Sequence, residues 1–127
     1  MFTRVGVRVP LHSSGVGKAF LAGRPPAEVL DYFRSAKKVR YTENSLVKED
    51  EFLRDIEETR TRGYAVDREE FEDGVGCIAV VITQKGEAAG AMSISGPSSR
   101  LFGASTAKLA AEVVRSAAVV SQRLSGR

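Results

Sequence analysis

Apolar residues recur at the helical spacing of three and four positions in four segments of the chain. These segments also have residues suited to helix ends. Ser14 and Ser105 can accept hydrogen bonds at a helix start, and Gly23, Gly63 and Gly126 can follow a last turn. We therefore predict helices over residues 15–22, 26–37, 48–62 and 106–124.

A change to a β pattern follows in the second half of the chain. Residues 77–82 are rich in β-branched side chains, and the turn-forming residues 84–86 connect them to a small, alternating segment over residues 87–95. This pattern predicts a hairpin. In its second strand Ser93 and Ser95 lie two positions apart, so both project from one face of the sheet.

A third strand is predicted at the N-terminus. Residues 3–9 place valine at every second position until Pro10 interrupts the pattern. The resulting order is strand, three helices, hairpin and helix, which predicts an α+β fold with the last helix covering the sheet. The first strand has no partner next to it in the sequence, so we expect the sheet to be incomplete on that side.

Length and composition indicate one globular domain. The chain has 127 residues, of which 43% are hydrophobic and 28% charged. Its longest stretch without a charged residue, 88–99, is too short to cross a membrane. The first residues lack the apolar core of a secretory signal, so we expect a cytoplasmic protein. The single cysteine, Cys77, cannot form an intrachain disulfide.

Charge is strongly segregated, although the net charge is only +3. Residues 1–40 carry eight Lys and Arg against two acids, residues 41–73 carry five against twelve, and residues 74–127 carry six against two. A nucleic-acid interface would need basic residues on one face together with a groove-reading helix or stacking aromatics. No such helix is evident. The basic residues between 34 and 40 end a predicted helix, where cations complement its dipole.

Residues 15–20 partly resemble two nucleotide-binding motifs but match neither of them. Residues 15–18, Gly-Val-Gly-Lys, resemble a phosphate-binding loop, but Ala19 stands where Ser or Thr is required and His12 stands where a Gly is required. The dinucleotide-binding pattern fails because Phe20 replaces its third small residue.

A nucleophilic site is a second alternative. His12, Asp67 and Cys77 could supply a thiol, a base and an orienting acid, although nothing in their spacing requires it. The same residues are too few for a typical metal site. We therefore expect no catalytic residue, no metal and no cofactor.

Four segments together carry a family resemblance. They are Pro-Leu-His-Ser-Ser-Gly-Val-Gly-Lys-Ala at 10–19, Gly-Tyr-Ala-Val-Asp-Arg-Glu-Glu at 63–70, Gly-Cys-Ile-Ala at 76–79 and Ser-Ile-Ser-Gly-Pro at 93–97. In this order and spacing they resemble the effector-binding domain of the IclR family of bacterial transcriptional regulators. The resemblance implies a GAF-like, profilin-like α+β fold, in which helices flank an antiparallel sheet. It also implies a small organic acid as effector, and a dimer or tetramer.

The chain departs from the family pattern at its N-terminal side. The winged helix-turn-helix domain, the linker helix and the first strands of the effector domain have no counterpart in residues 1–127. We therefore expect residues 1–127 to be a partial effector-binding domain that reaches DNA only through a domain outside them. An uncovered sheet edge would then favour self-association.

The resemblance also implies a ligand site. Gly15 and Val16 match positions that contact the effector through main-chain nitrogen, and free N–H groups at a helix start suit a carboxylate. Other matching positions line the same pocket: Asp67, Cys77, Ser93 and Ser95. We add Leu21, Phe33 and Met92 as apolar walls.

Asp67 restricts the ligand. Its carboxylate would repel an acid unless it is protonated or accepts a hydrogen bond from the ligand, which favours a hydroxy or hydrated-aldehyde substituent. The sensor hypothesis is weighed against two others, a small enzyme that uses Cys77 with His12 and a structural dimerisation module. Reversible ligand binding without turnover separates the sensor from both.

Overall fold

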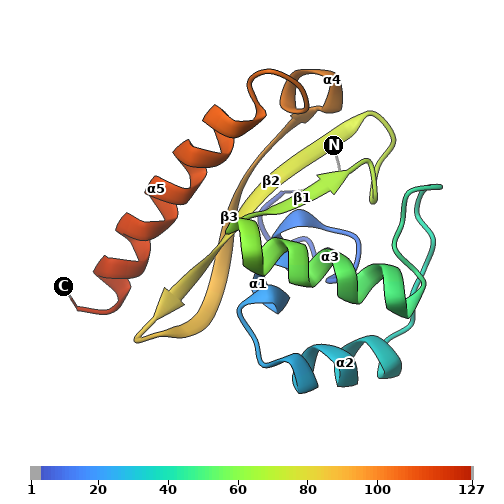
Figure 1. Cartoon of the computed structure of the whole chain (residues 1–127), viewed down its shortest axis with the longest axis horizontal. Helices are drawn as coiled ribbons and strands as arrows, with labels where there is room; N and C mark the ends of the chain where they lie inside the picture. The colour runs from blue at the N-terminus through green and yellow to red at the C-terminus, as the bar shows by residue number, and fades with distance from the viewer. Residues whose placement is uncertain (1–3, 127) are drawn as a thin grey trace.

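The chain folds into five helices and three strands across the residues described by the computed structural model, 4–126 (Figure 1). In chain order the elements are α1 (Gly15–Ala22), α2 (Pro26–Ser35), α3 (Glu49–Arg62), β1 (Ala65–Arg68), β2 (Val75–Gln84), β3 (Glu87–Pro97), α4 (Ser98–Leu101) and α5 (Thr106–Leu124). No helix within residues 4–126 is long and apolar enough to cross a bilayer.

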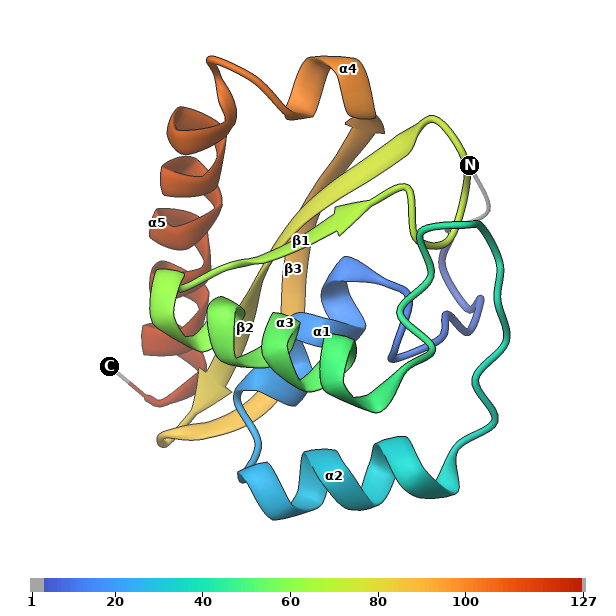
Figure 2. The same cartoon turned by 45° about the vertical axis from the view of Figure 1, so that its right-hand side comes forward.

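The strands form an antiparallel sheet in the order β1-β2-β3. Helix α5 covers one face, and α1 packs against the other, with α2 and α3 beyond it (Figures 1 and 2). The register brings Asp67 of β1 opposite Cys77 of β2, and Cys77 in turn opposite Ser95 of β3. The α+β class and the flanking helices agree with the prediction.

Local signals explain the helix ends. The hydroxyl of Ser14 accepts a hydrogen bond from the N–H of Gly17 at 3.1 Å and so caps α1. Helix α3 has three acids in its first turn and arginines in its last, and it ends at Gly63 with a φ of 90°. The start of α1 and the end of α3 lie where the sequence predicts them.

Three apolar clusters hold the layers together. The first joins the sheet to α4 and α5, and its buried members are Ile78, Val80, Leu101, Ala110, Val113 and Ala117. The second joins α1, α2 and α3 around Leu21, Val29, Phe33, Phe52 and Ile56. The third consists of Ala19, Ala65, Cys77 and Ala79, between α1 and the sheet. Its side chains are small, so α1 approaches the sheet closely.

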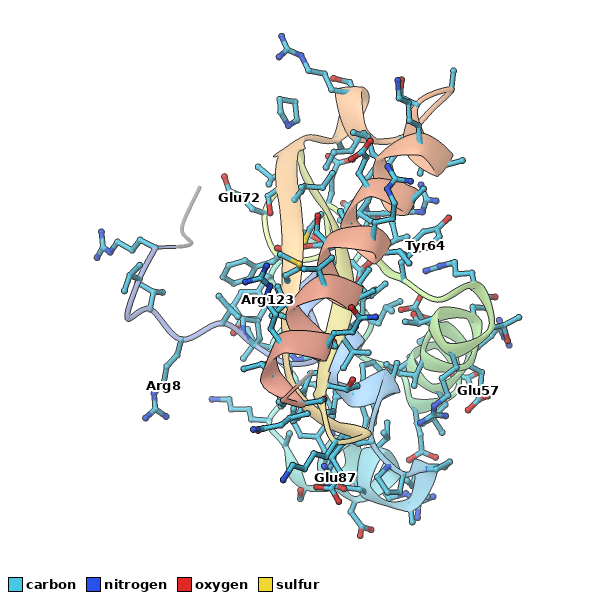
Figure 3. All side chains as sticks on the ribbon, turned by 90° about the vertical axis from the view of Figure 1, so that its left-hand side faces the viewer. Arg8, Glu57, Tyr64, Glu72, Glu87 and Arg123 are labelled. Carbon is cyan, nitrogen blue, oxygen red and sulfur yellow. The ribbon has the colours of Figure 1, made fainter. Side chains whose placement is uncertain are left out.

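The strand predicted over residues 3–9 is wrong where it can be assessed. Thr3 lies outside the described residues, and residues 4–9 pair with no strand in the described part of the chain. Gly6 has a φ of 88°, and the N–H of Val7 donates to the carbonyl of Arg4 in a turn. Arg8 projects away from the body of the molecule (Figure 3). Alternating valines form a strand only where a neighbouring strand can pair with them.

Three further details differ from expectation. The sequence analysis did not identify β1 or α4 as elements. Ser105 precedes α5, but its side chain caps no N–H group. The hydroxyl of Thr106, the first residue of α5, instead accepts from the N–H of Gly103 in the preceding loop at 2.8 Å.

Candidate functional site

A partly open cavity of about 110 Å³ lies where the start of α1 faces the sheet. Its walls come from α1, the three strands and the loop between β1 and β2. The lining residues are Ser14, Gly15, Val16, Asp67, Phe71, Glu72, Val75, Cys77, Ser93 and Ser95. We call this space the α1 cavity. It brings together all six residues that the sequence analysis named as ligand contacts.

Sheet register explains how residues far apart in sequence meet here. Asp67, Cys77 and Ser95 form a row across the three strands, and Ser93 lies two positions from Ser95 on the same face. The thiol of Cys77 lies beside Ser93 and Ser95 in the wall of the cavity. Burial raises the pKa of Cys77, so its thiol is protonated at neutral pH.

The start of α1 contributes unbonded backbone donors. Gly15 and Val16 occupy the first turn, where N–H groups have no partner within the helix. Within residues 4–126 neither N–H makes a hydrogen bond, whereas that of Gly17 is bonded to Ser14. Two free donors at the positive end of a helix dipole therefore border the cavity, an arrangement that favours an anion.

The protonation state of Asp67 determines the charge of the cavity wall. It is only 6% exposed, and this burial raises its pKa to about 7, although the N–H of Glu70 donates to its Oδ1 at 2.8 Å. At neutral pH a large fraction of the side chain is thus protonated and able to donate a hydrogen bond. The cavity therefore presents hydroxyls, amides and a neutral acid to a ligand.

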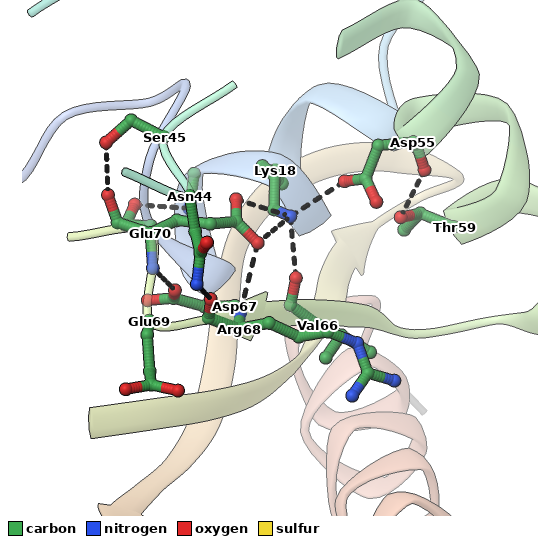
Figure 4. A network of polar contacts seen from close by, with 12 residues as sticks. Lys18, Asn44, Ser45, Asp55, Thr59, Val66, Asp67, Arg68, Glu69 and Glu70 are labelled. Atoms are coloured by element: carbon green, nitrogen blue, oxygen red, sulfur yellow. Dashed lines mark hydrogen bonds and ion pairs between the residues drawn. The ribbon is translucent and has the colours of Figure 1, made fainter. Parts of the chain in front are cut away.

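Beside the cavity, Lys18 is fully buried. Its Nζ donates to the carbonyl of Val66 at 2.6 Å, to Oδ2 of Asp55 at 2.7 Å and to Oε2 of Glu70 at 3.0 Å (Figure 4). Burial alone would lower the pKa of Lys18, but the charges of Glu70 and Asp55 overcome this effect and raise it. The ammonium stays charged, with all three of its hydrogens bonded.

Comparison with known proteins settles the family. Residues 1–122 match the family described as bacterial transcriptional regulator IclR, C-terminal. The chain belongs to the IclR family. It is 40% identical to the HTH-type transcriptional repressor AllR of Klebsiella pneumoniae over 80% of this chain and 38% of that protein. It is 37% identical to the HTH-type transcriptional regulator BhcR of Paracoccus denitrificans over 91% of this chain and 42% of that protein.

The fold comparison agrees with the family. The crystal structure of the Agobacterium tumefaciens repressor BlcR superposes with a TM-score of 0.91 at 26% identity, over 98% of this chain and 51% of that one. The IclR-family chain described here thus spans roughly two fifths of the two curated regulators. Residues 1–122 correspond to the C-terminal part of the family.

Three predicted wall residues of this IclR-family domain lie elsewhere. Leu21 and Phe33 belong to the core between α1, α2 and α3. Met92 alternates with Ser93 along β3 and packs against the cluster under α5. None of the three lines the α1 cavity. For Met92 the reason is strand geometry, because neighbouring residues of a strand point to opposite faces.

The enzyme alternative finds no support in this geometry. His12 is 2% exposed and lies outside the α1 cavity, with its Nε2 3.0 Å from the carbonyl oxygen of Val39. Cys77 has a raised pKa, the opposite of an activated thiolate. Within residues 4–126 no group of three or more His, Cys, Asp or Glu side chains is placed to hold a metal.

Sequence reasoning missed four lining residues and the buried lysine. Val75 could have been found, because it lies two positions before Cys77 on the same strand face. Ser14 was assigned only a capping role. Phe71 and Glu72 lie in the loop after β1, where no periodic signal exists.

Proposed function

We propose that this chain is the effector-binding domain of an IclR-family regulator and that a small organic acid binds in the α1 cavity. One observation supports the proposal above all others. Two backbone N–H groups without partners in the described chain, those of Gly15 and Val16, border a partly open cavity whose other side carries the hydroxyls of Ser93 and Ser95. A cavity with a few convergent polar groups is the expected form of a small-molecule site.

The chemistry of the walls selects the ligand. In this proposal a carboxylate accepts from the N–H groups of Gly15 and Val16, and a serine hydroxyl donates to its second oxygen. Asp67 then faces the rest of the ligand, where its carboxyl group hydrogen-bonds a hydroxyl or a hydrated carbonyl. A cavity of about 110 Å³ suits a compact hydroxy acid of few non-hydrogen atoms rather than a large aromatic one.

Regulation follows from differential binding in this account. The effector stabilises one arrangement of the domain, and that arrangement biases a separate DNA-binding domain of winged helix-turn-helix type. The intact regulator is proposed to be a cytoplasmic homodimer or tetramer. The two curated relatives are named HTH-type regulators, which supports the DNA-binding part of the proposal.

A thermal-shift panel of small acids tests the proposal. Because a ligand that binds only the folded state raises its melting temperature, glycolate and related hydroxy acids should stabilise the protein, and acetate, which lacks the hydroxyl, should stabilise it less. No accompanying turnover of the acid is expected. Two results would count against the site: unrelated anions such as sulfate stabilise the protein as much as glycolate does, or no small acid stabilises it.

A further inference from the structure

The buried ammonium of Lys18 lies one turn beyond the free amides of Gly15 and Val16 on the same helix. A buried cation without partners is unstable, so its three acceptors must be essential to its placement. Two of them, Asp55 and Glu70, are carboxylates, and the third is the carbonyl of Val66. Val66 directly precedes Asp67 in β1, so Lys18 holds the backbone on one side of the cavity's acid.

Glu70 holds the other side. Its Oε2 accepts from Lys18 at 3.0 Å and from the N–H of Arg68 at 3.0 Å, while its own N–H donates to Oδ1 of Asp67 at 2.8 Å. Figure 4 shows this closed set of contacts around the chain that leaves β1. The position of the Glu70 backbone therefore determines the direction in which the Asp67 carboxyl group points.

Charge around Asp67 is mostly negative. The titratable and charged groups near it come from the loop after β1, from β2, from α1 and, through Lys18, from α3; they are Glu69, Glu70, Glu72, Cys77, Lys18 and Asp55. Lys18 supplies the positive charge of this set. It favours the ionised form of Asp67. The N–H of Glu70 also favours the ionised form, whereas the carboxylate charge of Glu70 favours the protonated form.

We propose that Lys18 is a positioning residue of the α1 cavity, which orients Asp67 toward the ligand through its bonds to Val66 and Glu70. The proposal rests on the proposed function in so far as Asp67 meets a ligand. The charge coupling of Lys18 and Glu70 to Asp67 is a property of the ligand-free protein and can be measured there.

A lysine that merely stabilised the fold would predict a different pattern. Because charges act through space, loss of the cation and loss of the anion should move the protonation midpoint of Asp67 in opposite directions in either case. Only a positioning role also predicts weaker ligand binding by Lys18→Met at a pH where Asp67 is protonated in both proteins.

The test is a pH titration of ligand-free protein labelled with ¹³C at the aspartate carboxyl groups, with Asp67 assigned by Asp67→Asn. Lys18→Met should raise the Asp67 midpoint by about one pH unit, and Glu70→Gln should lower it by about as much. Matched controls remove the same charges elsewhere. Lys108→Met, on the exposed face of α5, and Asp73→Asn, on the exposed loop after β1, should leave the midpoint unchanged.

Folding failure does not block the test. Glu70→Gln keeps the shape and an acceptor oxygen of the side chain, and the double variant Lys18→Met/Glu70→Gln removes the buried charges as a pair. The double variant should return the midpoint toward that of wild type. Midpoints that move in the same direction in Lys18→Met and Glu70→Gln, or that stay at the wild-type value in folded Glu70→Gln, would overturn the proposal.

Ligand binding gives a second readout. At about pH 5, where Asp67 is protonated in wild type and in Lys18→Met, glycolate should bind Lys18→Met about tenfold more weakly because the carboxyl group is no longer oriented. If the midpoints shift as expected but glycolate and other small acids do not bind wild type, the charge coupling of Lys18 and Glu70 to Asp67 stands and the proposed ligand class fails. Unchanged glycolate affinity in folded Lys18→Met, with binding intact in wild type, would refute the positioning role alone.

Discussion

The backbone of Gly15 packs directly against the thiol of Cys77, with no space for a side chain between them. A Cβ atom on Gly15 would lie 2.6 Å from Sγ and 3.2 Å from Cβ of Cys77. This contact joins the first turn of α1 to the central strand and sets the width of the α1 cavity. It explains on steric grounds why the helix begins with glycine here.

Gly15→Ala should therefore damage both stability and binding. The added methyl group must push α1 away from β2, which costs about 1–3 kcal/mol of unfolding free energy by analogy with other overpacked sites. It also displaces the N–H groups that face the cavity, so glycolate affinity should fall at least about tenfold. Urea unfolding and calorimetric titration measure the two effects. In the control Gly90→Ala the new Cβ meets no atom within 4 Å, and neither quantity should fall.

The pH dependence of binding should follow Asp67. Its pKa is raised to about 7 by burial, so the protonated form that tolerates a bound carboxylate is lost as the pH rises above that value. Glycolate affinity should be nearly constant between about pH 5 and about pH 6, where glycolate is ionised and Asp67 protonated, and should decrease roughly tenfold per unit above about pH 7. Calorimetry in buffers of different ionisation enthalpy should also detect proton uptake on binding. Affinity that increases with pH would rule out this role for Asp67.

The same group makes a prediction about stability. Because the folded-state pKa of Asp67 is raised from 3.8 to about 7, the folded protein binds this proton more tightly than the unfolded chain. Its stabilising contribution is therefore fully present below about pH 4 and is lost as the pH rises through about 7. Asp67→Asn has no such loss and keeps an oxygen that can accept from Glu70. It should exceed wild type in unfolding free energy by on the order of 3 kcal/mol at about pH 8, and by little at about pH 4.

Substitutions on the two faces of β3 should affect either ligand affinity or stability, but not both. Ser95→Ala removes a hydroxyl that lines the cavity, so glycolate affinity should fall about fivefold with little change in melting temperature. Met92→Ala removes a side chain packed beneath α5 on the opposite face, so it should lower the unfolding free energy by about 1–3 kcal/mol and leave affinity unchanged. Loss of stability in Ser95→Ala together with loss of affinity in Met92→Ala would mean that the two faces of β3 are misassigned.

The sequence predicted most of the helices and the hairpin because each buries one regular face. Helix α5, for example, buries Ala110, Val113 and Ala117 at helical spacing. Strand β1 escaped notice because three of its four residues are buried, which removes the alternation that identifies a strand. The valines of residues 4–9 show the converse, since Val5 alternates correctly and is nevertheless fully exposed.

The site was less accessible to sequence reasoning. Gly15, Asp67 and Ser95 were chosen from a family resemblance, because residues spread over three elements share no local spacing. Lys18 gave no signal at all, since a lysine next to a polar turn is usually solvated. Its burial depends on Asp55 and Glu70, which lie 37 and 52 positions away in the chain.

The most direct test of the central claim is a ¹H–¹⁵N spectrum recorded during titration with glycolate. Binding at the start of α1 predicts large, saturable shifts of the Gly15 and Val16 amide signals, with the amide protons moving downfield as they donate to the carboxylate, and little change at Gly90. Saturable shifts confined to other parts of the molecule, with the signals of Gly15 and Val16 unmoved, would contradict the account.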